Sequence, residues 1–354
     1  SFGEPTPVRG DSIFRISSMT KPITAVAAMI LVEECRLRLD EPVDRLLPEL
    51  SDRRVLTRLD GPLDETVPAH RAITLRDLLS FRMGFGQVYE SPETLPIYNA
   101  ANEMGIGMGP PQPSSMPEPD EWLRRLGQLP LMHQPGERWM YNTGSDVLGV
   151  LIKRASGQPF EAFLKERIFG PLGMRDTGFS VPAADLARLT TSYMADQGLG
   201  ELSINDEPAG GQWSVPPAFP SGAAGLVSTA IDYLRFGEMM LACGQYEGVR
   251  ILSRPSVETM TTDHLTPQQK AVSGFFPGYF DNRGWGFGVC VITRRDDLAA
   301  VPGRYGWDGG LGTSWYSDPR EGLTAILMTQ RAAFPLFSNV YLDFWTSVYQ
   351  AIED

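Results

Sequence analysis

The feature that most constrains the fold is an apolar run at residues 23–32, close to the start of the chain. A helix of this composition is apolar nearly all round, so it must lie buried between layers of other elements. The run is too short to span a membrane, because Lys21 precedes it and Glu33 and Glu34 follow it. We therefore expect a buried helix over residues 18–34, against which the rest of the chain packs.

A serine and a lysine stand three residues apart where this helix begins. Ser18 and Lys21 would share one face of the first turn, so hydroxyl and amine could meet. Burial against the apolar run would disfavour the charged amine, and a neutral Lys21 could take the serine proton. Ser18 would also lie near unpaired helix N–H groups, which favour an oxyanion. The same spacing is typical of an ordinary capped helix start, although a cation is unfavourable at that end.

Composition limits the partners and cofactors. The chain has 354 residues and a net charge of -12, which argues against nucleic acid and anionic membranes as partners and favours a small neutral substrate. Cys35, Cys243 and Cys290 are too few and too far apart for a disulfide framework or a zinc site. No complete nucleotide-binding or metalloprotease motif occurs, so we expect no cofactor and no metal. We expect a soluble, cytoplasmic protein, and the start at Ser1 instead of Met leaves export open.

Strand-like patterns occur near both ends of the chain, and helical patterns dominate its middle. The expected strands cover residues 12–16, 285–293, 313–317 and 323–329, and the expected flanking helices cover 222–240 and 338–352. This order predicts an α/β sandwich, an antiparallel sheet flanked by helices, with an inserted and mostly helical domain. The α/β domain would comprise residues 1–50 and 222–354, and the inserted domain residues 51–221. The cleft between them is the expected active site.

Two later stretches could complete the chemistry of a serine–lysine pair, which needs a proton shuttle and an oxyanion donor. Tyr141 stands at a turn before a helical pattern, where its hydroxyl could project into the cleft. Residues 305–315 place several glycines beside a strand, where backbone N–H groups could approach a substrate. Each stretch alone is also typical of core packing or of a hairpin turn. Their occurrence together, after the Ser18 motif, favours the catalytic interpretation.

In this order the motifs resemble those of the serine β-lactamase and penicillin-binding-protein superfamily. The similarity covers most of the chain and is greatest to the class C β-lactamase-like branch that includes the family VIII carboxylesterases. The resemblance implies a β-lactamase/transpeptidase-like fold. It also implies that Ser18 is the nucleophile, Lys21 its proton acceptor, and Tyr141 the general base and acid.

By the same resemblance, Trp307, Asp308 and Gly309 occupy the third motif, and the N–H groups of Ser18 and Gly310 form the oxyanion hole. β-Lactamases have Lys-Thr-Gly there, and the lysine and threonine help to hold the substrate carboxylate. An aspartate facing that carboxylate would repel it by about 1 to 4 kcal/mol. The Trp-x-Gly-Gly pattern is also the one that family VIII esterases carry. Both points favour a neutral ester over a β-lactam.

The tyrosine motif also departs from the family pattern. Thr143 stands two positions after Tyr141, where asparagine is expected, and Asn142 is displaced by one. The aromatic stretch 275–280 and the methionine-rich tract 83–119 could rim the acyl pocket, and short acyl chains would then be preferred. Packing of a surface loop is the alternative for the first stretch, and a surface insertion is the alternative for the second. The substrate-pocket candidates are Asn142, Thr143, Asp308 and Phe276.

The sequence thus predicts a serine carboxylesterase that cleaves small esters through a covalent acyl-enzyme, with a weak β-lactamase side activity. A β-lactamase, a D-amino-acid-specific peptidase or an acyltransferase on the same fold stays open, because the motifs identify the nucleophile and not the acyl acceptor. A catalytically silent binding protein is the alternative from another class. A Ser-His-Asp hydrolase is disfavoured, because the chain has no Gly-x-Ser-x-Gly motif. The oligomeric state is not predicted.

Overall fold

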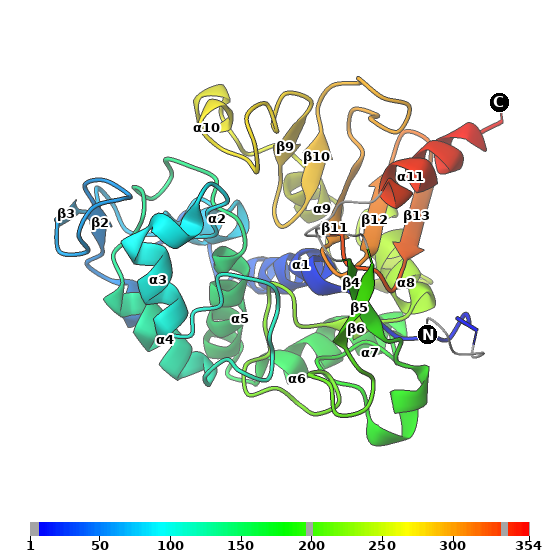
Figure 1. Cartoon of the computed structure of the whole chain (residues 1–354). Coiled ribbons are helices and arrows are strands. Elements are labelled where there is room, and N and C mark those ends of the chain that lie inside the picture. The colour runs from blue at the N-terminus through cyan, green and yellow to red at the C-terminus, as the bar shows by residue number, and fades with distance from the viewer. Residues whose placement is uncertain (1–6, 196–200, 334–338, 354) are drawn as a thin grey trace.

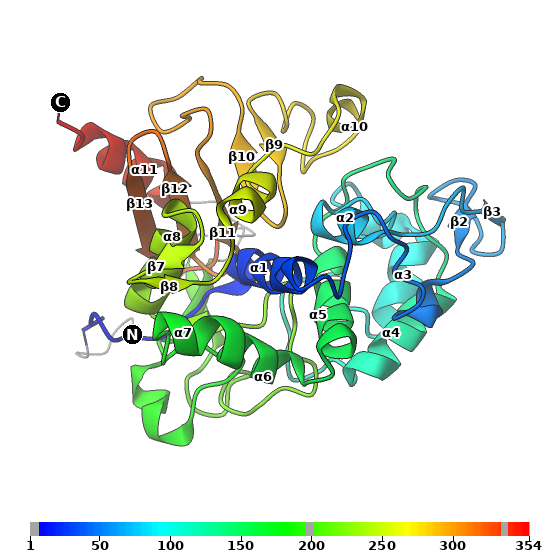
Figure 2. The ribbon, with the colours of Figure 1, turned by 180° about the vertical axis from the view of Figure 1, so that it is seen from behind.

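The expected buried helix forms the centre of the molecule. The computed structural model describes residues 7–195, 201–333 and 339–353. Helix α1 (Thr20–Glu33) is buried from residue 20 to residue 31. It runs through the middle of the molecule, with the main sheet on one side and helices on the other (Figures 1 and 2). A 3-10 turn at Ser17–Met19 precedes it, so Ser18 lies in this turn and not in the α-helix itself.

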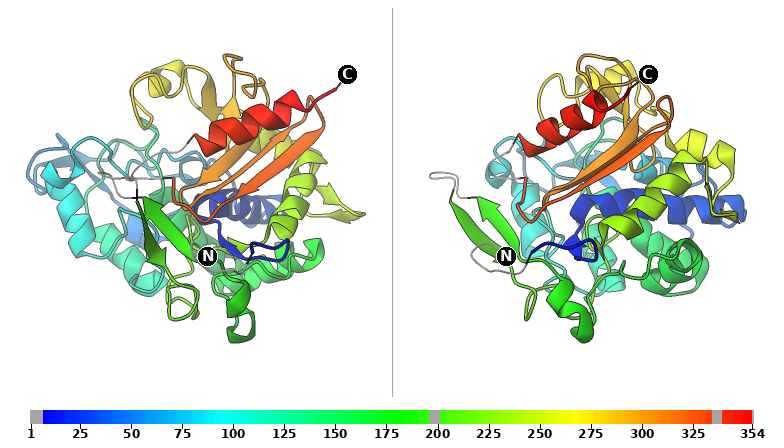
Figure 3. Two further views of the ribbon diagram at one scale, coloured as in Figure 1. Left: turned by 45° about the vertical axis from the view of Figure 1, so that its right-hand side comes forward. Right: turned by 90° about the vertical axis from the view of Figure 1, so that its right-hand side faces the viewer.

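The main sheet is antiparallel and has the strand order β13-β12-β11-β10-β9. Its strands are β9 (Arg283–Trp285), β10 (Cys290–Ile292), β11 (Tyr305–Gly309), β12 (Thr313–Asp318) and β13 (Leu323–Met328). Helix α11 (Val340–Gln350) covers one face of this sheet, and α8 (Ala230–Leu241) covers the other (Figure 3). The predicted arrangement of an antiparallel sheet flanked by helices is confirmed.

The middle of the chain is predominantly helical, as expected. Its helices are α2 (Leu75–Leu79), α3 (Pro96–Glu103), α4 (Pro119–Gln128), α5 (Thr143–Ser156), α6 (Phe160–Leu164) and α7 (Gly170–Leu172). Helix α5 packs directly against α1, and this contact brings the residues after Tyr141 to the start of α1. The remaining elements are β2 (Arg54–Leu56), β3 (Thr66–Pro68), β4 (Ser192–Ala195), β5 (Leu202–Asp206), β7 (Gln245–Tyr246), β8 (Val249–Arg250), α9 (Arg254–Met260) and α10 (Pro267–Ala271).

The division into two domains stays a proposal, and the strand bridges bear on its second boundary. Isolated β-bridges join Ile13 to Leu189, Gly178 to Val227, and Tyr193 to Arg331. They tie the last part of the 51–221 range back to segments from both ends of the chain. We therefore propose that the inserted domain ends before residue 178, and not at residue 221.

Three elements differ from their predicted form. The strand near residue 14 is β1 (Phe14–Arg15), and it pairs with β6 (Val227–Ser228) instead of joining the main sheet. The pattern at 285–293 forms the hairpin β9–β10, because a turn at residues 286–289 interrupts it. The predicted helix 222–240 begins only at Ala230, with Thr229 as its N-cap. The predicted start of the last helix, Ser338, lies outside the described residues.

In the described ranges, none of the helices combines the length and the apolar character that a membrane crossing would need.

Candidate active site

Ser18 and Lys21 meet as their spacing predicts. The turn at Ser17–Met19 feeds directly into α1, and Lys21 Nζ lies 3.0 Å from Ser18 Oγ. The Lys21 side chain is completely buried, whereas Ser18 is partly exposed. The hydroxyl is therefore open to a substrate, while the amine beneath it is shielded from water.

Burial lowers the pKa of Lys21 to about 7, although the nearby Asp146 carboxylate opposes this shift. Besides Ser18, the amine has two oxygen partners, Asn142 Oδ1 at 2.9 Å and the Ala223 carbonyl at 2.8 Å. These two oxygens can only accept hydrogen bonds, so they match the two N–H bonds of a neutral amine. The remaining lone pair of the neutral amine then faces the Ser18 hydroxyl. The geometry thus suits a Lys21 that accepts the serine proton.

Asp146, which sequence reasoning missed, supports this arrangement from the first turn of α5. Its Oδ1 accepts hydrogen bonds from Ser221 Oγ at 2.6 Å and from the Ala223 N–H at 3.1 Å. Ala223 therefore links the carboxylate to the amine, since its carbonyl accepts from Lys21. Burial raises the pKa of Asp146. An acid in the first turn of a helix is ordinary in a sequence, so only the packing of α5 against α1 identifies it.

Tyr141 lies beside Ser18 and Lys21. Ser18 is close enough to oppose the rise of the Tyr141 pKa, and the phenol oxygen accepts a 2.6 Å hydrogen bond from Trp307 Nε1. Lys21 Nζ lies 4.4 Å from the centre of the Tyr141 ring. Burial is the largest cause of a raised Tyr141 pKa, so the phenol is protonated at neutral pH. This protonation state suits a proton relay better than a tyrosinate base.

Asn142 is placed by an unusual backbone turn. Its φ of 84° and ψ of -68° define a γ-turn of positive φ, closed by the Thr143 N–H, which donates to the Tyr141 carbonyl at 3.3 Å. Such a conformation costs about 1 to 3 kcal/mol for a residue other than glycine. The turn directs the Asn142 amide to Lys21, so the displaced asparagine still contacts the lysine. Thr143 is buried and begins α5.

The end of β11 lies against the turn that carries Ser18. A Cβ at Gly309 would lie 2.3 Å from the Ile16 carbonyl oxygen, so only glycine fits there. Thr313 Oγ1 donates to the same oxygen at 3.2 Å. The Gly309 carbonyl accepts from Tyr341 at 3.0 Å, and the N–H of Gly310 in that peptide points the opposite way. This arrangement is compatible with Gly310 as an oxyanion donor.

Trp307 and Asp308 have different surroundings. Trp307 contacts Tyr141, whereas Asp308 accepts hydrogen bonds from Ser314 and Tyr316 of β12. Since Trp345 of α11 donates to Ser314, the Asp308 carboxylate lies on the side of the sheet that α11 covers. Burial raises the pKa of Asp308. These contacts do not support the expectation that Asp308 faces the substrate and repels a carboxylate.

The aromatic stretch reaches the site through Phe275 and not through Phe276. The Phe276 side chain is 61% exposed and meets Tyr279 edge to face. The Phe275 ring lies 5.1 Å from the Tyr141 ring and 6.2 Å from the Trp307 ring, measured between centroids. The sequence drew attention to this stretch, but two adjacent phenylalanines give no signal for which one points inward.

The methionine-rich tract contributes mainly to the core. Met83 and Met108 are buried, and Met104 and Met116 are partly buried against the same apolar cluster.

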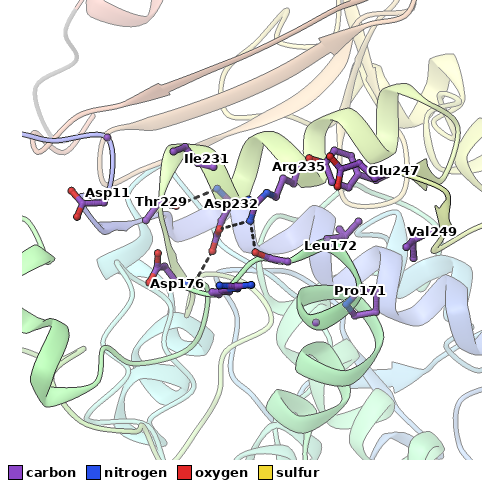
Figure 4. A pocket seen from close by; sticks show the side chains of 15 residues that line it. Asp11, Pro171, Leu172, Asp176, Thr229, Ile231, Asp232, Arg235, Glu247 and Val249 are labelled. Atoms are coloured by element: carbon purple, nitrogen blue, oxygen red, sulfur yellow. Dashed lines mark hydrogen bonds and ion pairs between the residues drawn. The ribbon is translucent and has the colours of Figure 1, made fainter.

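A pocket of about 580 Å³ lies away from these residues, between α7, α8 and the β7–β8 hairpin (Figure 4). Two of its charged side chains have partners within the chain. Asp232 accepts from the Asp176 N–H at 2.7 Å, and Arg235 donates to the Gly173 carbonyl. In the residues that the structure describes, no group of three or more His, Cys, Asp or Glu is arranged to hold a metal ion.

Comparison with known proteins agrees with this geometry. A protein of Mycobacterium tuberculosis described as uncharacterized is 40% identical over 92% of this chain and 79% of its own length. Esterase EstB of Burkholderia gladioli is 33% identical, with the same coverage of both chains. The structure of EstCE1, described as a hydrolase with promiscuous acyltransferase activity, has a TM-score of 0.77 and 26% identity over 99% of this chain and 88% of its own. The family model described as Beta-lactamase matches residues 1–341, so the chain belongs to the beta-lactamase family.

Proposed function

We propose that this protein is a serine carboxylesterase that cleaves small carboxylic esters through an acyl-enzyme on Ser18. The observation that carries the proposal is the 3.0 Å contact between Ser18 and a completely buried Lys21 whose pKa is lowered to about 7. An amine of this pKa is half neutral near physiological pH, so it can act as a general base without a further activator.

In the acylation step, Lys21 takes the Ser18 proton and the serine oxygen attacks the ester carbonyl. The carbonyl oxygen becomes an oxyanion, which the N–H groups of Ser18 and Gly310 stabilise. The C–O bond to the alcohol then breaks, and Tyr141 donates its proton to the leaving oxygen. Lys21, which carries the serine proton, then returns a proton to Tyr141. Its Nζ lies 4.4 Å from the centre of the Tyr141 ring, so this transfer needs a small movement of the amine or a bridging water. The products of this step are the free alcohol and an ester on Ser18.

In the deacylation step, water attacks the Ser18 ester and gives up a proton to neutral Lys21, either directly or through the Tyr141 hydroxyl, which passes its own proton to the amine. The acid is released when Ser18 regains its proton. Both steps use the same groups in opposite directions, and neither requires a metal or a cofactor.

The choice of ester over β-lactam rests on Trp307. Where the β-lactamase motif has a lysine, this chain has an indole whose N–H is bonded to Tyr141. An indole offers no charge to hold a substrate carboxylate. The similarity to EstB and EstCE1 supports the same choice. We expect at most weak cleavage of nitrocefin, which should stay far below the rate on methyl butyrate.

An acyltransferase that uses an alcohol in place of water is a second candidate, favoured by the similarity to EstCE1. Adding a primary alcohol to the ester assay distinguishes the two. Formation of the new ester at the expense of free acid would identify transfer, and unchanged acid release would identify hydrolysis. We place the enzyme in the cytoplasm, which fractionation of the native host would test.

The central experiment is covalent labelling with a fluorophosphonate probe, read by intact mass spectrometry. One label is expected, on the tryptic peptide of residues 16–36, because the Lys21–Pro22 bond resists trypsin. Ser18→Ala should abolish both labelling and ester turnover, while the matched variant Ser17→Ala should keep both. Full turnover by Ser18→Ala would refute the assignment of the nucleophile.

A further inference from the structure

The Phe275 ring occupies the space beside the catalytic tyrosine. It meets the Tyr141 ring edge to face at 5.1 Å, and it lies nearly parallel to the Trp307 indole, at 6.2 Å and an angle of 20°. The Trp139 ring lies on a third side of Phe275, with 5.2 Å between the two ring centroids. Phe275 therefore sits in an aromatic box whose other walls belong to the active site or adjoin it.

The loop that carries Phe275 is anchored on both sides of it. Before it, Ser273 Oγ accepts a hydrogen bond from the backbone N–H of Trp139 at 3.0 Å. After it, the buried rings of Tyr279 and Phe280 pack on Trp139 at 6.1 and 5.3 Å. The Phe275 ring also meets Tyr279 edge to face at 4.9 Å. The contacts of Ser273 and Phe280 with Trp139 do not involve the Phe275 side chain, so they should hold the loop when that ring is removed.

The Phe275 ring is only partly buried, and its outer contact comes from another segment. Tyr89, which is 46% exposed, meets Phe275 edge to face at 4.9 Å. Tyr89 lies in the segment between α2 and α3, and Phe275 in the segment between α10 and β9. The two rings form the outer cover of the box, so a substrate group that enters there must displace Phe275.

The chemistry of acylation identifies which substrate group this would be. In the proposed function, on which this inference rests, Tyr141 protonates the leaving alcohol. The carbon group on that oxygen must then lie beside the Tyr141 ring, which is the space that Phe275 fills. We propose that Phe275 determines specificity for the alcohol part of the ester: it restricts the enzyme to esters of small alcohols such as methanol and ethanol. An aryl alcohol group would have to take the place of the phenyl ring between Tyr141 and Trp307.

Phe275→Ala tests this proposal against the matched variant Phe276→Ala, which removes the exposed neighbouring ring. The measurement is kcat/KM for methyl acetate, benzyl acetate and 1-naphthyl acetate, each expressed as the ratio of variant to wild type. This ratio cancels the intrinsic reactivity of each leaving group. For Phe275→Ala the ratio should rise by about tenfold or more from methyl to 1-naphthyl acetate, the scale on which a changed pocket discriminates. Phe276→Ala should give equal ratios throughout.

Esters that differ in the acyl group and share the same alcohol provide the control for this test. Methyl butyrate and methyl benzoate should give the same ratio for Phe275→Ala as methyl acetate. A gain for methyl benzoate without a gain for 1-naphthyl acetate, or equal ratios for all alcohols, would overturn the proposal. Phe275→Leu should lie between alanine and wild type, and thermal unfolding will show whether each variant is folded. If wild type hydrolyses esters and Ser18→Ala does not, the proposed function stands whichever way the Phe275 ratios fall.

Discussion

The pKa of Lys21 can be changed from a distance, through Asp146. We expect Asp146→Asn to move the acidic limb of the kcat/KM profile to lower pH. The asparagine Oδ1 can still accept from Ser221 and from the Ala223 N–H, so the turn that holds the Lys21 partners should persist. The substitution then removes the negative charge and little else.

The direction follows from linkage. In the proposed mechanism the base is neutral Lys21, so kcat/KM should rise as pH passes the Lys21 pKa of about 7. Asp146 stabilises the ammonium form, and its removal therefore lowers that pKa further. At an effective dielectric constant of about 20, two charges roughly 6 Å apart interact by about 3 kcal/mol, or about 2 pKa units. Because burial also raises the pKa of Asp146, we expect a shift of about 1 to 2 units.

The assay is kcat/KM for methyl butyrate between pH 4.5 and 9, read by the methanol released and corrected for spontaneous hydrolysis. The matched control is Asp232→Asn, since Asp232 is a buried aspartate of α8 whose pKa is also raised by burial. It should leave the limb in place. A limb that stays near pH 7 in Asp146→Asn, or moves upward, would show that Lys21 is not the titrating base or that Asp146 does not act on it.

Substitutions at three further positions test which contacts keep the site residues in place. Trp307→Phe keeps a flat ring but removes the 2.6 Å hydrogen bond that the indole donates to the Tyr141 hydroxyl. We expect kcat to fall about tenfold with little change in the thermal unfolding temperature. An unchanged kcat would contradict a role for that hydrogen bond. Asn142→Gly and Asn142→Ala both lose the amide, but only glycine accepts φ 84° without strain. Urea unfolding should therefore find the glycine variant more stable by about 1 kcal/mol, and equal stabilities would contradict the presence of backbone strain at this residue. Gly309→Ala places a carbon 2.3 Å from the Ile16 oxygen, so kcat/KM should fall about a hundredfold, whereas Gly109→Ala meets nothing within 4 Å and should retain activity.

The local part of the site could be predicted from the sequence. Ser18 and Lys21 lie three residues apart on a turn that leads into a helix, so their contact follows from backbone geometry. The apolar run that follows them forces burial, and burial is the main cause of the low Lys21 pKa. Tyr141 and Trp307 could be assigned only through the resemblance to a family, because no local pattern predicts contacts across such separations.

The rest of the site depends on packing that no local pattern contains. The stretch 222–226 has a helical composition, but a Cβ at Gly222 would lie 2.3 Å from the Ser145 carbonyl oxygen, and Thr24 donates to the Gly222 carbonyl at 2.7 Å. Gly222 is thus packed tightly against both α1 and α5, and the segment makes a single turn, closed by the Gly225 N–H and the Ser221 carbonyl, instead of a continuous helix. It also presents the Ala223 carbonyl to Lys21. The error in the predicted helix and the failure to find this Lys21 partner thus have one physical cause.

The reactivity of Lys21 is therefore a property of the fold and not of the motif alone. In a free helix the same spacing would give a solvated, charged lysine beside a serine. Here α5 brings Asn142 and Asp146, and the segment before β6 brings Ala223, so the amine loses water but keeps two oxygen partners. Either change alone would fail, because burial without acceptors would leave N–H groups unpaired and acceptors without burial would leave the charged form favoured. The Ser-x-x-Lys spacing becomes catalytic only where both conditions hold.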